Sequence, residues 1–381
     1  MLLSIALTLA LILFTAHLGS VALYLRRLAS SKSQPCAIGL PFVTLLRPVC
    51  GRDSFDVETL ASSFTQDYPD YEVIFCAPSQ TDAAVPVVRA LIDAYPQVSA
   101  RLLIGQKNYT VNPKLNNLWK GWQAANSNWV CMSDSNLLLP PHYLRTVVST
   151  WGARTGLVSC PAIGMSPQGF AGSLECAFLN SNQARIQFSA DSLGIGFAQG
   201  KTLFWNRDVL DKSGGLAALG THLAEDVCAT KFVRANGLSV SLTPLPFAQP
   251  IGRRRLRDVW ERQLRWSRVR RDGFPWLFAS EIANGPMLGL LALMAAGSLL
   301  LYPTWIVLIY LSFWYGAEVF LMRRAGWPAR SLDFMALPLR DCLLPILWVT
   351  TYLRRDIEWR GTAMHRPKVD EHPRLTADSA V

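Results

Sequence analysis

The sequence predicts an α/β protein with a largely parallel sheet, held in a membrane by apolar helices near both ends. Residues 40–250 alternate short β-branched apolar runs with amphipathic stretches, which is the pattern of repeated strand–helix–strand units. Apolar stretches long enough to cross a bilayer lie on either side of this region, beginning at residues 2 and 285. A chain of 381 residues, half of them hydrophobic, can bury a sizeable core.

The first expected element is a retained membrane anchor in residues 1–27. Its apolar run, "LLSIALTLALILFTAHLGSVALYL", covers residues 2–25 and exceeds the roughly 20 residues that cross a bilayer. Arg26 and Arg27 follow it, so the positive-inside rule places this end in the cytoplasm. The run is too long, and lacks the charged region before it, for a cleaved signal peptide.

Residues 38–250 are expected to form the soluble α/β domain. Its candidate strands are residues 41–48, 71–78, 100–105 and 128–134. Between the first two lies "VETLASSFTQDYPD", which is helical in pattern until Pro69 and completes a βαβ unit. Neither GxGxxG nor GxxxxGK[ST] occurs, so the sequence supports neither a dinucleotide-binding fingerprint nor a P-loop.

Polar residues follow three of these strands, where open α/β sheets bind their ligands. Asp82 comes after the second strand, Asp134 closes the fourth, and Lys114 is expected in the loop after the third. The carboxylate of Asp134 suits a divalent cation, Mg²⁺ or Mn²⁺, that bridges the phosphates of a nucleotide. The alternative for Asp134 is an Asx turn or helix cap that satisfies backbone donors.

An acidic pair, Glu225 and Asp226, stands at the start of a predicted helix, where the helix dipole favours acids whatever their function. The preceding run, residues 199–215, includes Lys201 and has the pattern of a strand, a turn and a helix that deliver the pair to the same pocket. An aspartate that lies near a metal without binding it can accept a hydroxyl proton.

Residues 251–284 are expected to form amphipathic helices at the membrane surface. Nine arginines occupy the nineteen positions 253–271. In a helix, Arg262, Arg265 and Trp266 share one region, and a separate apolar stripe is formed by Leu256, Trp260 and Leu264. We expect the stripe to face lipid, the motif arginines to serve a diphosphate, and the other arginines to hold anionic headgroups.

The C-terminal part is expected to hold further membrane segments. Residues 285–324 predict a hairpin of two spans that turns at residues 302–304 and opens to the cytoplasm. Residues 332–355 are apolar but contain Arg340-Asp341, which favours an interfacial or re-entrant helix. Residues 356–381 are expected to be a cytosolic tail.

Several of these residues form a recognisable signature. Asp82, Asp134, Asp226 and "RQLRW" (262–266) resemble the D, D, D, (Q/R)xxRW pattern of processive and lipid-directed family 2-type glycosyltransferases. The sequence is more closely similar to the ceramide glucosyltransferases of glycosyltransferase family 21 in three segments: "NPKLNNL" (112–118), "RDVLDKSGGL" (207–216) and "LAEDVCATK" (223–231). The resemblance extends from about residue 40 to residue 275.

The resemblance implies a Rossmann-like GT-A fold and an inverting transfer from a nucleotide sugar to a lipid. It implies an integral membrane protein, expected in a bacterial inner membrane, whose active site faces the cytoplasm. The roles it implies are nucleotide binding for Asp82, metal and diphosphate binding for Asp134, and catalytic base for Asp226. Arg262, Arg265 and Trp266 would contact the diphosphate and the acceptor, Lys114 and Lys201 the diphosphate, and Glu225 the acceptor side. Many related enzymes have DxD at the metal, whereas the third position here is Asn136.

The function implied is transfer of glucose from UDP-glucose to the primary hydroxyl of ceramide. A hopanoid- or other lipid-directed enzyme that uses UDP-N-acetylglucosamine or UDP-galactose would share the same acids and anchors. A membrane-anchored nucleic-acid-binding protein would explain the net charge of +10 but leaves the three acids without a role, so no nucleic-acid partner is expected. A transporter would need more spans and more intramembrane polar pairs.

Overall fold

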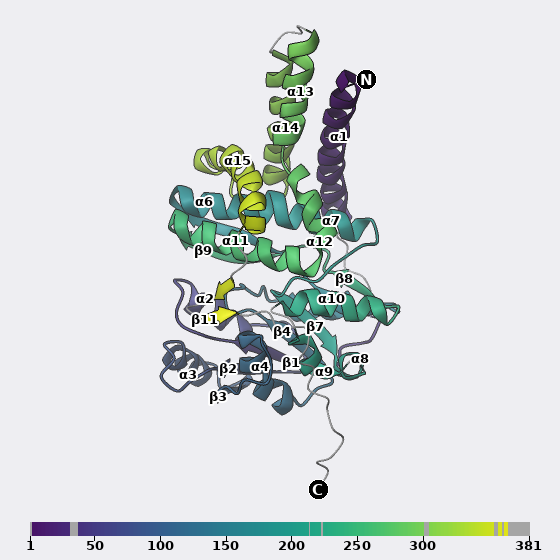
Figure 1. The fold of residues 1–381 in the computed structure, drawn as a ribbon. Coiled ribbons are helices and arrows are strands. Elements are labelled where there is room, and N and C mark those ends of the chain that lie inside the picture. Colours follow the sequence, from purple (N-terminus) through teal and green to yellow (C-terminus); the bar gives the residue numbers. More distant parts are fainter. Residues whose placement is uncertain are drawn as a thin grey trace.

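The computed structural model describes residues 2–30, 37–212, 214–221, 224–300, 305–353, 357–359 and 362–364. Figure 1 shows three levels: a domain built on a sheet, a layer of helices that lie across one end of it, and upright helices beyond that layer. The N-terminal helix belongs to the upright group. The described chain therefore has the expected α/β domain with apolar helices from both ends of the sequence.

The domain is built on a seven-stranded sheet in the order β3-β2-β1-β4-β7-β5-β8. The first four strands in the chain are mutually parallel, and β7 is antiparallel to both of its neighbours. All four predicted strands are confirmed. The bounds are β1 (Val43–Pro48), β2 (Tyr71–Ala77), β3 (Ser99–Ile104), β4 (Trp129–Ser133), β5 (Thr155–Ser159), β7 (Thr202–Asn206) and β8 (Ser239–Leu242).

Helices connect these strands over both faces of the sheet. They are α2 (Asp56–Ala61), α3 (Val85–Ala94), α4 (Pro113–Ala124), α5 (Tyr143–Ser149), α8 (Arg207–Asp211), α9 (Gly215–Leu219) and α10 (Glu225–Ala235). Alternate residues of β1 enter different cores, since Leu45 packs with α3 and α5 and Leu46 packs with α4. The core that contains Leu46 continues to Tyr24 of the first helix, so the domain and the upright helices share one apolar interior.

Two predictions in this domain are wrong in detail. The helix predicted as far as Pro69 ends as a short 3₁₀ turn at Phe64. Lys114 lies in the first turn of α4 and not in a loop, because the Asn112 side chain accepts hydrogen bonds from the first backbone N–H groups and Pro113 favours the first helical position.

The middle layer begins with the parallel pair β6 (Ala162–Gln168) and β9 (Phe247–Arg253). Its helices are α6 (Gly169–Ala177), a π-helical turn (Phe178–Ala184), α7 (Arg185–Ser192), α11 (Leu256–Gly273), α12 (Pro275–Ser280) and a 3₁₀ turn (Glu281–Ala283). The expectation that the apolar stripe of α11 faces lipid does not hold for the whole stripe, because Trp260 packs against the core whereas Leu256 is 54% exposed. Val259 and Leu264 are buried, and the helix packs on α6 and α15.

The arginines around α11 also differ from the prediction that they mostly hold headgroups. Arg254 forms a 3.0 Å ion pair with Asp53, and its side chain is only 16% exposed. Arg270 pairs with Glu281 at 2.6 Å. Even the exposed Arg257 has a protein partner, because Glu261 follows it by one helical turn. Intramolecular carboxylates therefore take up much of this charge.

The upright helices are α1 (Leu2–Ala29), α13 (Met287–Leu300) and α14 (Trp305–Arg324) (Figure 1). By length and composition, Ser4–Ala29 and α14 can each cross a membrane. The pair Pro275–Ala283 and Met287–Ala296 meets the same criterion together but bends by 50° at its break. The predicted turn at residues 302–304 lies outside the described residues.

The last long helix is α15 (Ser331–Leu353), which carries Arg340 and Asp341. Beyond it, the region predicted as a tail contains the short antiparallel pair β10 (Ile357–Trp359) and β11 (Thr362–Met364). Most of residues 356–381 lie outside the description.

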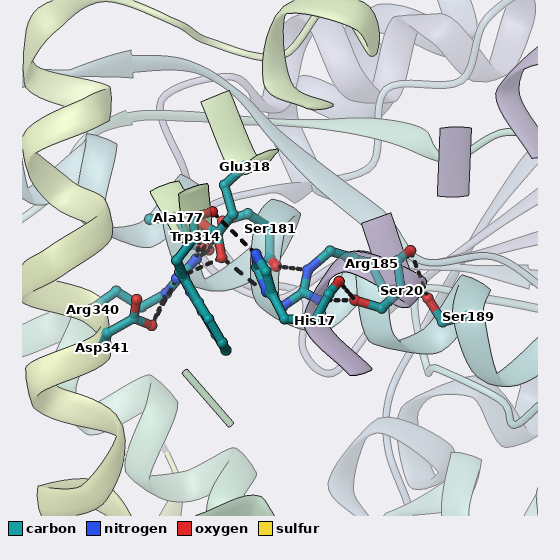
Figure 2. A network of polar contacts seen from close by, with 10 residues as sticks. All are labelled: His17, Ser20, Ala177, Ser181, Arg185, Ser189, Trp314, Glu318, Arg340 and Asp341. Atoms are coloured by element: carbon teal, nitrogen blue, oxygen red, sulfur yellow. Dashed lines mark hydrogen bonds and ion pairs between the residues drawn. The ribbon is translucent and has the colours of Figure 1, made fainter. Parts of the chain in front are cut away.

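Arg340 and Asp341 belong to a buried polar network that joins the upright helices to the middle layer (Figure 2). Arg340 donates to both carboxylate oxygens of Glu318, at 3.0 and 3.1 Å, and to Asp341 at 2.7 Å. It also donates to the Ser181 hydroxyl of the π-helical turn. The network continues from there through Arg185 and Ser20 to Ser189 and to the carbonyl of His17. The charges that are costly in lipid are thus paired inside the protein.

Candidate active site

The site lies where β4 ends beside the start of β7. The backbone N–H of Asp134 donates to the carbonyl of Lys201 at 3.1 Å, which holds the two strand ends together. The side chain of Lys201 also forms an ion pair with Asp134, with 3.1 Å between Nζ and Oδ2. Because β1, β2 and β4 are parallel, their carboxyl ends all face this edge of the sheet.

Lys114 joins three parts of the site. Its Nζ lies 2.7 Å from Asp134, 2.8 Å from Glu225 and 2.6 Å from the carbonyl of Gly200. Burial opposes the charge on this lysine, but the carboxylates of Asp134 and Glu225 outweigh burial and raise its pKa. In turn, although burial favours the neutral acid, Lys114 and Lys201 hold the pKa of Asp134 well below its usual range.

Asp226 has a different environment from its neighbour. Glu225 is occupied by Lys114 and by the side-chain amide of Asn112, which donates to it at 2.8 Å. Asp226 accepts two backbone hydrogen bonds, from Gly200 at 3.0 Å and from Val227 at 2.8 Å. Burial and the adjacent Glu225 charge raise the pKa of Asp226 to about 6. An aspartate with this pKa is ionised near neutrality and is still basic enough to accept a proton.

The side-chain oxygens of Asp134 and Asn136 both contact the ammonium group of Lys201. Lys201 Nζ lies 3.1 Å from Asp134 Oδ2 and 2.9 Å from Asn136 Oδ1. Within the described part of the chain, no group of three or more His, Cys, Asp or Glu residues could hold a metal ion. A divalent cation here would therefore take one carboxylate, one amide oxygen and the oxygens of a diphosphate, which is a donor set that Mg²⁺ accepts.

Asp82 lies on the same edge, at the end of β2. Both of its carboxylate oxygens accept from the backbone N–H of Gly51 at 3.0 Å, and one also accepts from Ala84 at 2.9 Å. These bonds fix the loop after β1. The structure thus places Asp82 in the loop after β2, two strands from Asp134 across β1.

Two of the three motif residues of α11, Arg262 and Trp266, lie against α6 and β9. Arg262 forms a 2.9 Å ion pair with Glu175 of α6 and lies 5.9 Å from the Trp266 ring centroid. Its charge contributes, after burial, to lowering the pKa of Lys201, so Arg262 is within electrostatic reach of the cluster. Trp266 packs on Cys176, Leu179 and Ile251. Arg265 is partly exposed on the same helix.

Three residues of the site were not among the site residues predicted from the sequence. Gly200 contacts Lys114 and Asp226 through its backbone, and Asn112 both caps α4 and binds Glu225. Arg47 is fully buried and donates to the carbonyls of Ser135 and Leu137, which shapes the loop after Asp134. Three features of the sequence could have indicated them: the glycine before Lys201, the Asn-Pro pair at a helix start, and an arginine inside an apolar strand.

Gly200 provides the first testable prediction. A methyl group at this position would lie 2.7 Å from Glu225 Oε1, so Gly200→Ala must displace the Glu225 carboxylate that holds Lys114 beside Asp134. We expect turnover to fall by roughly 10²-fold, the cost of a misplacement of about 1 Å. Gly316→Ala is the control, because its added methyl group would meet open space. Equal activity of the two variants in a steady-state assay would show that the acid pair tolerates the shift.

Comparison with known families identifies the chain. The family model for glycosyl transferase family 21 matches residues 6–370. The chain belongs to this family. The glycosyl transferase family 21 assignment makes the protein a glycosyltransferase, and it covers the anchors as well as the sheet domain.

Three curated relatives of this family 21 chain are all named ceramide glucosyltransferase. Ceramide glucosyltransferase 3 of Caenorhabditis elegans is 25% identical over 336 residues, which are 86% of this chain and 73% of that protein. Ceramide glucosyltransferase 1 of the same organism is 29% identical over 244 residues, 64% of this chain and 52% of that protein. The ceramide glucosyltransferase of Komagataella phaffii is 28% identical, and the match covers 62% of its length. The match thus leaves a quarter to a half of each relative uncovered.

Among solved structures, the family 21 chain is similar to the mannosyltransferase PcManGT from Pyrobaculum calidifontis, determined in complex with GDP-Man and Mn2+. The TM-score is 0.51 at 17% identity, and the match covers 88% of this chain and 99% of that one. At this identity the likeness concerns the fold. It confirms the GT-A fold that the sequence motifs implied.

Proposed function

We propose that this chain transfers glucose from UDP-glucose to the primary hydroxyl of ceramide, with inversion at the sugar carbon. The observation that carries the proposal is Asp226, a half-buried acid of raised pKa beside a largely enclosed cluster of lysines and carboxylates. The names of the family 21 relatives support the choice of glucose and ceramide.

Asp226 supplies the base. Its carboxylate takes the proton of the acceptor hydroxyl as that oxygen attacks the anomeric carbon and the bond to the diphosphate breaks. One displacement of this kind inverts the anomeric configuration. The backbone N–H of Gly200 orients the carboxylate through Oδ2. The charge of Glu225 is neutralised by Lys114. Glu225 therefore positions Lys114 and does not accept the proton.

Lys114, Lys201 and the motif arginines serve the leaving diphosphate. The two ammonium groups already share Asp134, so they can shift to phosphate oxygens when the donor binds. Asp134 and Asn136 would hold a divalent cation that neutralises the diphosphate. Arg262 would leave its ion pair with Glu175 and bind the diphosphate or the acceptor. Arg265 would bind the diphosphate, and Asp82 would bind the nucleotide.

The cytoplasmic orientation is supported by the basic ends of two upright helices. Arg27, at the end of α1, pairs with Asp191 of the middle layer at 2.5 Å and donates to the carbonyl of Pro244. Arg323 and Arg324 end α14. Because the basic end of α1 is held against the catalytic side, the positive-inside rule puts that side in the cytoplasm.

The substrates are tested with the purified chain in detergent. Labelled UDP-glucose, UDP-galactose and UDP-N-acetylglucosamine are each combined with ceramide and with a hopanoid acceptor. We expect glucosylceramide with β configuration from the α-linked donor and little product from the other pairs. Preferred transfer of N-acetylglucosamine to the hopanoid would replace the proposal with the alternative acceptor class.

Metal binding at Asp134 is a separate prediction. Asp134→Ala should raise the KM for UDP-glucose and weaken the response to Mn²⁺ together, because the carboxylate would bind the cation that carries the diphosphate. Asn136→Asp adds a charge to the same donor set and should lower the Mn²⁺ concentration needed for half-maximal activity. Full activity of the native chain in EDTA would argue against a metal, and Asp134 would then act through its lysines alone.

A further inference from the structure

An apolar cavity of about 250 Å³ lies in the membrane-side layer, outside the charged cluster. Three helical segments line it. Leu174 and Phe178 come from α6 and the turn that follows it, and α15 contributes Leu339, Leu343 and Leu347 at one-turn spacing. The remaining lining comes from α11: Leu256, Val259, Trp260 and Gln263. An apolar cavity of ~150 Å³ is enough to bind benzene, so this one can take a longer hydrocarbon segment.

Gln263 is the polar residue of this lining. Its side chain is 2% exposed, and its Oε1 accepts a hydrogen bond from Gln183 at 2.9 Å. Among the residues that the structure describes, its Nε2 has no hydrogen-bond partner, although buried amide donors are nearly always satisfied. Gln263 thus places one unsatisfied donor within an otherwise hydrocarbon wall, where a small rotation of its amide could bring it to a ligand with one acceptor oxygen beside a long chain.

The cavity is joined to the catalytic machinery through α11. Gln263 directly follows Arg262, whose charge reaches Lys201, and Trp266 lies one turn further on. Leu256, one end of the lining, is 54% exposed and opens the cavity to the surface. A lipid that entered there would lie with its polar end toward the motif residues.

We infer that this cavity binds the fatty acyl chain of an N-acylated lipid acceptor, with Gln263 Nε2 donating to the amide carbonyl. The inference rests on the proposed lipid acceptor and specifies which part of it the protein holds. The carbonyl selects the acyl chain over the other chain of the lipid, because the acyl chain is the one that continues from the carbonyl carbon.

Photolabelling tests binding without requiring turnover. A ceramide with a diazirine in its N-acyl chain is irradiated with the full-length protein in detergent, and labelled peptides are mapped. We expect labels within residues 256–263 and 339–347, and at least a fivefold loss of labelling in Gln263→Leu. Labels confined to other segments would overturn the site, and equal labelling by a free fatty acid probe would overturn the role of the amide donor.

Acyl-chain selectivity gives a second readout. Leu343→Trp fills the cavity from α15 and should raise the KM for long-chain ceramide at least tenfold, with little effect on short-chain ceramide or UDP-glucose. The matched control is Ile346→Trp on the same helix, where the side chain is 52% exposed and outside the lining. An equal rise for both chain lengths would contradict the cavity. Absence of any transfer by the native chain would instead contradict the proposed function, and photolabelling would still decide the cavity.

Discussion

Asp226→Asn is expected to lower turnover by about 10²–10⁴-fold, the usual contribution of a general base, while the KM for UDP-glucose stays within a few fold. Asparagine keeps the shape of the side chain and can still accept the hydrogen bond from Gly200. It cannot take a proton from the acceptor hydroxyl. Steady-state kinetics with both substrates separate the two effects.

The pH profile provides an independent check of the same residue. As the proposed base, Asp226 would have to be ionised to act, and its pKa is raised to about 6, so its active form would be lost as pH falls through that value. We expect kcat/KM of the native enzyme to be level above pH ~7 and to fall about tenfold per pH unit below the pKa. Asp93→Asn, an exposed change on α3, should keep this profile. Near-normal turnover of Asp226→Asn would reduce Asp226 to a helix-terminal acid.

Arg340→Met is expected to destabilise the protein by about 3–5 kcal/mol, the cost of breaking a buried ion pair. Glu318 and Asp341 are both fully buried, and Arg340 lies within 3.1 Å of each. Without it, Glu318 would keep its longer ion pair with Arg185, at 4.0 Å. Chemical denaturation in detergent measures the loss.

Arg257→Met is the control for this experiment, because its pair with Glu261 is solvent-exposed and little change is expected. The double variant Arg340→Met, Glu318→Met should recover part of the stability by removing one stranded charge. If Arg340→Met unfolds like the control, the network shown in Figure 2 does not carry the packing of α14 and α15.

The sequence predicted the sheet well because its strands are buried on both faces and appear as continuous apolar runs. Asp134, Glu225 and Asp226 were found for a related reason: charged residues stood out where apolar strands ended or a helix began. The contacts among them were not predictable, since the Lys114 bridge depends on how α4 meets the end of β4 and the start of α10 in the folded chain. Periodicity showed that α11 has an apolar side but not whether lipid or α15 covers it.

The arrangement around α11 also bears on how this enzyme could change its substrates. One wall of the cavity comes from α15, whereas α11 both lines the cavity and carries the motif residues Arg262, Arg265 and Trp266. Mutations at Leu339, Leu343 or Leu347 can therefore alter the preferred lipid without altering sugar chemistry. Mutations in α11 alter both together. We therefore expect substitutions that change the acceptor range to concentrate in α15. Substitutions in α11 should be tolerated less often.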